Sequence, residues 1–99
     1  MKVVWTAQAQ ARLAELHTYV AEDQHLNADR LIDRLTRRGD QIGSQPYSGR
    51  AVPEYRRDDL REILEGSYRI IYLILDERID IVTVRHGAKM LSDDWNDLR

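Results

Sequence analysis

The segment from Arg61 to His86 constrains the fold of this chain most strongly, because its pattern is typical of three β-strands joined by two tight turns. We predict strands at 60–64, 67–75 and 79–85, where β-branched and aromatic residues are frequent. The turns are predicted at Glu65-Gly66 and at 76–78, since glycine supplies unusual backbone angles and aspartate bonds its own backbone. The segment therefore predicts an antiparallel meander.

The middle strand of this meander is apolar on both faces. Period-2 alternation places one set of side chains on one face (Tyr68, Ile70, Tyr72 and Ile74) and another set on the opposite face (Ile71, Leu73 and Leu75). We therefore expect a central strand that is covered on both sides. A two-stranded hairpin alone is marginal in water, so the rest of the chain should supply helices that cover this meander.

The first half of the chain predicts a short strand followed by two helices. The strand is expected from Lys2 to Trp5, and Thr6 is a candidate N-cap for a helix that ends near Asp23. Asn27 is a candidate N-cap for the second helix, which Gly43 and Pro46 would terminate. The apolar residues recur at helical spacing (Ala9, Leu13, Leu16 and Val20, then Ala28, Leu31, Ile32, Leu35 and Ile42). Because the link is short, the helices should form an antiparallel hairpin on one sheet face.

The remaining segments carry weaker patterns. Residues 44–59 contain Pro46, Gly49 and Pro53 without a clear period, which predicts a long ordered loop. Residues 87–99 predict a short helix or a partly ordered tail. The whole of 1–99 is thus expected to form a single α+β domain. It would contain an N-terminal strand, an antiparallel two-helix hairpin and a three-stranded antiparallel meander, with the first strand pairing with a later one in a mostly antiparallel sheet.

Composition narrows the possible functions. The 99 residues carry a net charge of −2, include no cysteine and contain no apolar run long enough for a membrane span. No two histidines lie at metal-ligand spacing, and no glycine-rich phosphate loop is present. We therefore expect a cytoplasmic protein without metal, cofactor or membrane association.

Several short motifs occur in order along almost the whole chain (Trp5-Thr6, Leu13-Ala14-Glu15-Leu16 and Tyr19, Pro46, Gly49-Arg50, Val52-Pro53-Glu54, Arg61-Glu62-Ile63, Tyr68-Arg69-Ile70-Ile71-Tyr72 and Val84-Arg85-His86-Gly87). Together they resemble the ParE/RelE superfamily, the toxins of bacterial type II toxin–antitoxin modules. The resemblance implies the fold described above. It also implies a small cognate antitoxin as partner, in a toxin–antitoxin hetero-oligomer.

The superfamily contains two mechanisms. RelE-like members cut mRNA on the ribosome, a reaction that needs a base, an acid and cations beside the phosphate. By resemblance, such a set would contain Glu54 as base, His86 as acid, and Arg69 with Arg61 or Lys89 as phosphate ligands. ParE-like members instead inhibit DNA gyrase by binding it.

Two observations favour the ParE-like branch. The C-terminal tyrosine typical of the nucleases is missing, and the tail offers Trp95, which cannot act as an acid or base. Residues 50–99 carry nine Lys/Arg against eleven Asp/Glu, whereas binding to ribosomal RNA favours an excess of positive charge. We therefore expect an inhibitor of DNA gyrase, with a ribosome-dependent endoribonuclease as the alternative.

The resemblance also implies two binding surfaces. Antitoxin contacts are expected at one group of residues (Leu13, Leu16, Tyr19, Val20, Arg69 and Tyr72), and target contacts at another (Arg85, His86, Lys89 and Trp95). Simpler roles remain open for several of them. Arg69 could pair with Glu62 or Glu65 across the first turn, His86 could be a hydrogen-bonded structural residue, and Tyr68 and Tyr72 could belong to the core. A degenerate member that only binds its antitoxin is a third possibility.

Overall fold

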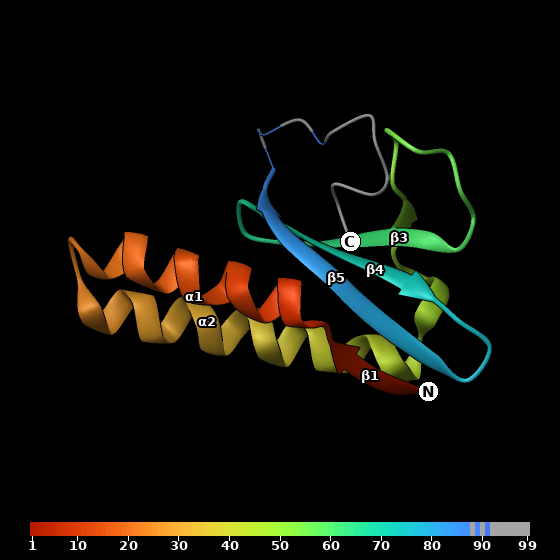
Figure 1. Cartoon of the computed structure of the whole chain (residues 1–99), viewed down its shortest axis with the longest axis horizontal. Coiled ribbons are helices and arrows are strands. Elements are labelled where there is room, and N and C mark those ends of the chain that lie inside the picture. The colour runs from red at the N-terminus through yellow and green to blue at the C-terminus, as the bar shows by residue number, and fades with distance from the viewer. Residues whose placement is uncertain (88, 90, 92–99) are drawn as a thin grey trace.

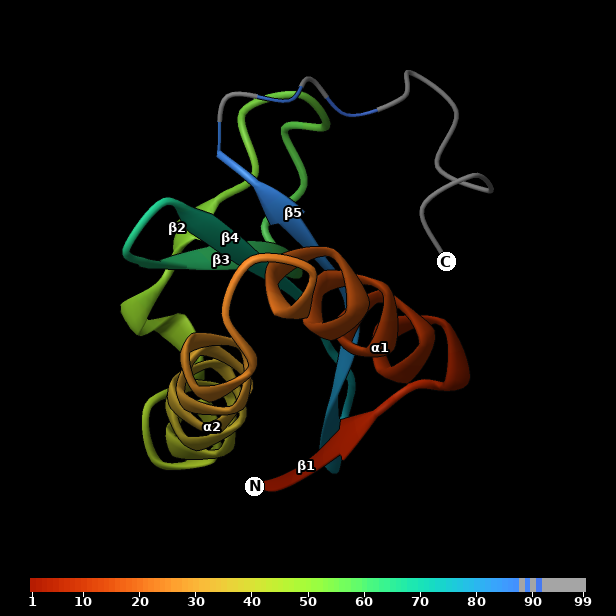
Figure 2. The same ribbon diagram turned by 90° about the vertical axis from the view of Figure 1, so that its left-hand side faces the viewer.

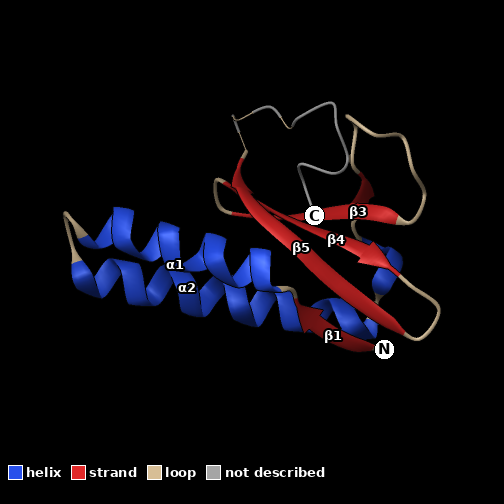
Figure 3. Cartoon of the chain, in the orientation of Figure 1, coloured by secondary structure: helices blue, strands red, loops and turns tan. Residues whose placement is uncertain are grey.

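A computed structural model describes residues 1–87, 89 and 91 of the chain as a helical hairpin packed on a five-stranded sheet (Figure 1). The elements in order are β1 (Lys2–Trp5), α1 (Ala7–Ala21), α2 (His25–Asp40), the 3-10 turns η1 (Gln41–Ser44) and η2 (Pro46–Ser48), β2 (Arg50–Ala51), β3 (Leu60–Glu65), β4 (Tyr68–Ile74) and β5 (Arg78–His86). The strand order in the sheet is β1-β5-β4-β3-β2. Figure 3 shows the two long helices side by side, with β3, β4 and β5 grouped together beyond one end of them.

The predicted meander is confirmed, but the sheet around it is larger and mixed. β3, β4 and β5 pair antiparallel in sequence order, and β4 is central as expected. β1 pairs with β5 in parallel, with Trp5 opposite Ile81. β2 pairs with β3 inside the segment that the sequence predicted as a loop. Two residues are too few for a periodic signal, and the direction of β1 is set by the helical crossover rather than by its own residues.

The helix starts show one correct and one wrong prediction. Thr6 caps α1, since its hydroxyl accepts a hydrogen bond from Ala9 N at 3.1 Å. Asn27 does not cap α2, which begins at His25 after Gln24. The Asn27 amide instead donates to the Gln24 side chain within the first turn. The helix thus begins earlier than the sequence indicated, and its N-cap residue Gln24 makes no side-chain cap hydrogen bond.

The main core lies between the helices and the sheet. It contains ten buried residues (Ala9, Leu31, Leu35, Ile42, Ile63, Ile70, Tyr72, Ile79, Ile81 and Val84). Figure 2 shows the two helices side by side on this face of the sheet. Gly39 lets α2 approach β1 closely, because a Cβ atom there would lie 2.3 Å from Trp5 Cζ2. Glycine weakens a helix relative to alanine, but at this position the close packing against Trp5 requires it.

A second, smaller core covers the opposite face of the sheet. It contains Val52, Leu60, Ile71, Val82 and Leu91, with Tyr55 and Leu73 packed against it. The prediction that both faces of the middle strand are covered is therefore confirmed. The loop between β2 and β3 covers the face that the helices leave open. Apart from Gly87, Lys89 and Leu91, the predicted helix or tail at 87–99 lies outside the described residues.

The first turn of the meander is shifted by one residue from its predicted place. β3 continues through Glu65, so the turn is formed by Gly66 and Ser67. Gly66 has a φ of +59°, in the left-handed region that glycine enters without strain. This turn sets the register in which Leu64 faces Arg69.

Candidate functional site

Arg69 is the centre of a buried network of charges on the helix-free face of the sheet. It lies on β4 and is 5% exposed. Its Nη1 and Nη2 donate to the two carboxylate oxygens of Glu54 at 2.9 and 2.8 Å. Its Nε donates to Glu62 Oε1 on the neighbouring β3 at 2.8 Å. The predicted alternative of an Arg69–Glu62 pair is therefore confirmed, and Glu54 adds a second, bidentate partner.

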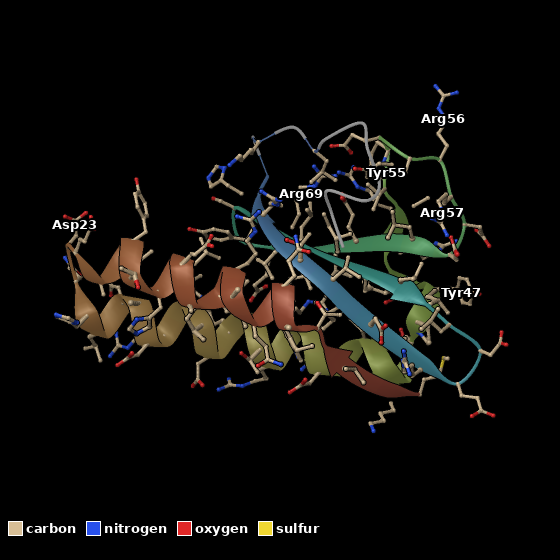
Figure 4. The ribbon with its side chains drawn as sticks, viewed as in Figure 1. Asp23, Tyr47, Tyr55, Arg56, Arg57 and Arg69 are labelled. Atoms are coloured by element: carbon tan, nitrogen blue, oxygen red, sulfur yellow. The ribbon has the colours of Figure 1, made fainter. Side chains whose placement is uncertain are left out.

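The network continues to Arg50. Its Nε donates to the second oxygen of Glu62 at 2.7 Å, so this carboxylate, 1% exposed, binds two guanidinium groups. Two arginines face two glutamates, and the four charges balance. Figure 4 shows Arg69 above the sheet, on the side away from the helices. The groove beside it is lined by Arg50, Pro53, Glu54, Arg69 and Gly87, and its cations already have anionic partners.

The network fixes the protonation of Glu54. The Arg69 hydrogen bonds lower the pKa of Glu54 from 4.5 to about 2, against the opposing effect of burial. The backbone N–H of Leu91 donates to the same carboxylate at 3.3 Å and acts in the same direction. The pKa of Arg69 is raised in turn by Glu54. A carboxylate with a pKa so far below neutrality accepts a proton weakly, so Glu54 is a poor general base.

Arg61, a candidate phosphate ligand, lies on the other face of the sheet. It is opposite Tyr72 in the β3–β4 ladder, whereas Glu62 is opposite Ile71. Its guanidinium donates to the carbonyl of Gly49 at 2.8 Å and to the Asp58 carboxylate at 2.6 Å, and it lies 4.8 Å from the centre of the Tyr47 ring. Period-2 alternation therefore keeps Arg61 from joining Arg69 around one phosphate.

The expected target residues gather at the far end of β5. Arg85, His86 and Lys89 line a groove that α1 closes with Arg12, Glu15, Leu16 and Tyr19. His86 is exposed at the strand end, and its ring meets Tyr68 edge-on at 5.6 Å. Of the expected target residues, Trp95 lies outside the described part of the chain.

The expected antitoxin residues divide into accessible and inaccessible ones. Tyr19 is 73% exposed, while Leu13, Leu16 and Val20 are partly buried against the main core. Tyr72 is wholly buried, and its hydroxyl donates to Pro46 O at 2.6 Å and accepts from Gly49 N at 3.2 Å. Tyr72 and Arg69 are both buried and hydrogen-bonded within the chain, and Arg69 also lines the groove beside Glu54.

Sequence reasoning missed Arg50, Arg12 and Glu15. Arg50 enters the network because β2 pairs with β3 and brings it beside Glu62. Arg12 and Glu15 form an i,i+3 pair at 3.1 Å on α1, and only tertiary packing places this pair beside β5. An i,i+3 charge pair is visible in the sequence, but its neighbour across the groove is not.

Comparison with known proteins decides the family. Residues 3–91 match the family model described as "ParE toxin of type II toxin-antitoxin system, parDE". The chain belongs to this toxin family. The resemblance to the ParE/RelE superfamily is thereby confirmed, and a role as a type II toxin–antitoxin toxin with it.

One curated relative and two solved structures are similar to this ParE-family chain. Toxin RelE2 of Caulobacter vibrioides is 32% identical over 90 residues, which cover 90% of this chain and 98% of the relative. The fold is similar to the chromosomal ParDE system of P. aeruginosa, with TM-score 0.73, 18% identity and coverage of 87% and 95% of the two chains. It is also similar to the RelBE2 toxin–antitoxin complex of Mycobacterium tuberculosis, with TM-score 0.65, 22% identity and coverage of 89% and 92%.

Within residues 1–87, 89 and 91, no helix of this family member is long and apolar enough to cross a membrane. No group of three or more His, Cys, Asp or Glu side chains among residues 1–87, 89 and 91 is arranged to hold a metal ion.

Proposed function

We propose that this toxin inhibits DNA gyrase by binding it, in the cytoplasm, and that a cognate antitoxin neutralises it in a hetero-oligomer. Production of the toxin alone would stop growth. A plasmid that carries the module would be retained, since cells that lose it lose the antitoxin supply.

The pairing of Arg69 with two carboxylates is the observation that favours gyrase, rather than RNA, as the target. Phosphate binding by Arg69 would require release from Glu54 and Glu62, which leaves two carboxylates in a largely buried site without their main partner. The nuclease set also lacks a base of suitable pKa, and Arg61 lies on the opposite face. The net charge of −2 adds to this, because counterion release drives RNA binding by basic proteins.

A supercoiling assay tests the proposal. Purified gyrase would be incubated with relaxed plasmid and ATP, with the toxin present or absent. We expect loss of supercoiling or accumulation of a trapped cleavage complex at micromolar toxin, with toxin pre-incubated with antitoxin as the matched control. Normal supercoiling without a trapped complex at that concentration contradicts the proposal.

The second candidate is a ribosome-dependent endoribonuclease, which the 32% identity to a protein named Toxin RelE2 favours. Its residues would be Glu54, Arg69 and His86, with Arg61 or Lys89. Primer extension on cellular mRNA after induction distinguishes the two candidates. New, toxin-dependent 5′ ends that disappear in His86→Ala support the nuclease.

A further inference from the structure

In the groove between α1 and the end of β5, one cation has no hydrogen-bond or ion-pair partner among the described residues. The Nε of Arg85 is buried and has no hydrogen-bond partner among the described residues. No ion pair within residues 1–87, 89 and 91 involves its guanidinium. Arg85 as a whole is half-buried, but its Nε–H is shielded from water, and a shielded donor without a partner costs free energy that an acceptor from a partner would recover.

The groove is basic although the chain is acidic. Arg12, Arg85 and Lys89 line it against one acid, Glu15, which already pairs with Arg12 at 3.1 Å. The whole chain carries a net charge of −2. Local positive charge on such a chain selects an acidic partner group and repels a basic one.

The groove is also open at the edge of the sheet. β1 pairs only with Arg78–Ile81, so no described strand lies beside the second half of β5 on that side. Leu16 and the 73% exposed Tyr19 supply an apolar rim from α1. A peptide segment with an acidic side chain and a neighbouring apolar one would fit both features.

We propose that this groove receives a carboxylate side chain of the antitoxin, which pairs with Arg85 while a neighbouring apolar side chain packs on Tyr19. The inference rests on the antitoxin partner in the proposed function and specifies the chemistry of its docking. It does not depend on gyrase as the target.

The test measures binding of the antitoxin encoded by the adjacent gene to the full-length toxin and its variants. We expect Arg85→Met to weaken binding about tenfold and Arg85→Glu about a hundredfold, because a desolvated charge pair is lost or reversed. The matched control is Arg34→Glu, which reverses an exposed arginine of α2 outside the groove and should change binding less than about twofold. Reversal of one antitoxin acid to lysine should restore binding to Arg85→Glu.

Thermal unfolding separates docking from a structural role. Because Arg85→Met removes a half-buried guanidinium whose buried Nε has no partner among the described residues, the melting temperature of the free toxin should stay unchanged or rise. Wild-type affinity for Arg85→Met overturns the inference alone. A lower melting temperature of Arg85→Met also overturns it, since the guanidinium then stabilises the free toxin. Absence of binding by the wild-type toxin overturns both the proposed antitoxin partner and the inference. The proposal that gyrase is the target is tested separately, by the supercoiling assay.

Discussion

Arg69 and Arg85 lie directly opposite each other across the β4–β5 ladder, yet among the described residues only Arg69 has carboxylate partners. Glu54 and Glu62 occupy the guanidinium of Arg69. Burial is the main cause that lowers the pKa of Arg85, and the nearby charge of Arg12 adds to it. One strand pair thus holds a cation that is paired within the fold and a cation without a carboxylate partner among the described residues.

Removal of Arg69 should destabilise the protein strongly. Arg69→Met leaves Glu54 without its bidentate partner and Glu62 with Arg50 alone, so we expect a loss of about 3 kcal/mol in the free energy of unfolding. Urea unfolding followed by circular dichroism measures it. The control is Arg37→Met, which breaks an exposed pair with Asp33 at 3.5 Å and should cost less than about 0.5 kcal/mol. Similar values for the two variants would contradict a structural role for Arg69.

Acid should weaken the same network. The pKa of Glu54 is about 2 in the folded protein against 4.5 ordinarily, so the unfolded state binds a proton first as the pH falls. The stabilisation is therefore complete above about pH 5 and is lost between about pH 5 and pH 2, with a size on the order of 2 kcal/mol. Stability measured across this range should fall less steeply in Glu54→Gln. Parallel pH profiles for the two proteins would refute the assignment.

Gly39→Ala should destabilise although alanine is the better helix former. The intrinsic gain is about 1 kcal/mol, but the added methyl group would lie 2.3 Å from Trp5 Cζ2 and 2.9 Å from Ile81 Cδ1. We expect a net loss of about 1–3 kcal/mol from overpacking. Trp5→Leu should reduce that loss in the double variant, which a double-mutant cycle of unfolding free energies detects. Additive effects would show that the two residues do not meet.

Toxicity should survive the loss of His86. The imidazole is exposed and contacts the Tyr68 ring, and the base that a nuclease would pair with it is the weakly basic Glu54. Growth arrest after induction of His86→Ala should still occur at equal toxin level, weakened only by the loss of one expected target contact. Complete loss of toxicity with an unchanged melting temperature, accompanied by loss of toxin-dependent mRNA cuts, would instead favour the endoribonuclease.

The sequence predicts the elements well where the periodic signal is long. The meander, both helices, the Thr6 cap and the two apolar faces of β4 follow from alternation and helical spacing. The family resemblance rests partly on residues at these positions and partly on motifs in the segment without a period, such as Gly49-Arg50 and Val52-Pro53-Glu54. Short or non-local features are not predicted from the sequence. Examples are the two-residue β2, the parallel direction of β1 and the start of α2.

The site is harder to predict because it depends on pairing across the sheet. The sequence allows Arg61 and Arg69 to converge on one phosphate, but the β3–β4 register places them on opposite faces. It allows Tyr72 to contact an antitoxin, but the loop at Pro46 and Gly49 binds its hydroxyl and covers it. The Glu54–Arg69 contact joins residues 15 positions apart through a loop without a period.

The rate of protein synthesis immediately after toxin induction tests the central claim most directly. If the toxin inhibits gyrase rather than cutting mRNA, incorporation of labelled methionine should continue at the uninduced rate for the first minutes, while cells later filament with unsegregated nucleoids. A collapse of incorporation within those minutes, before any change in the nucleoids, would contradict the account.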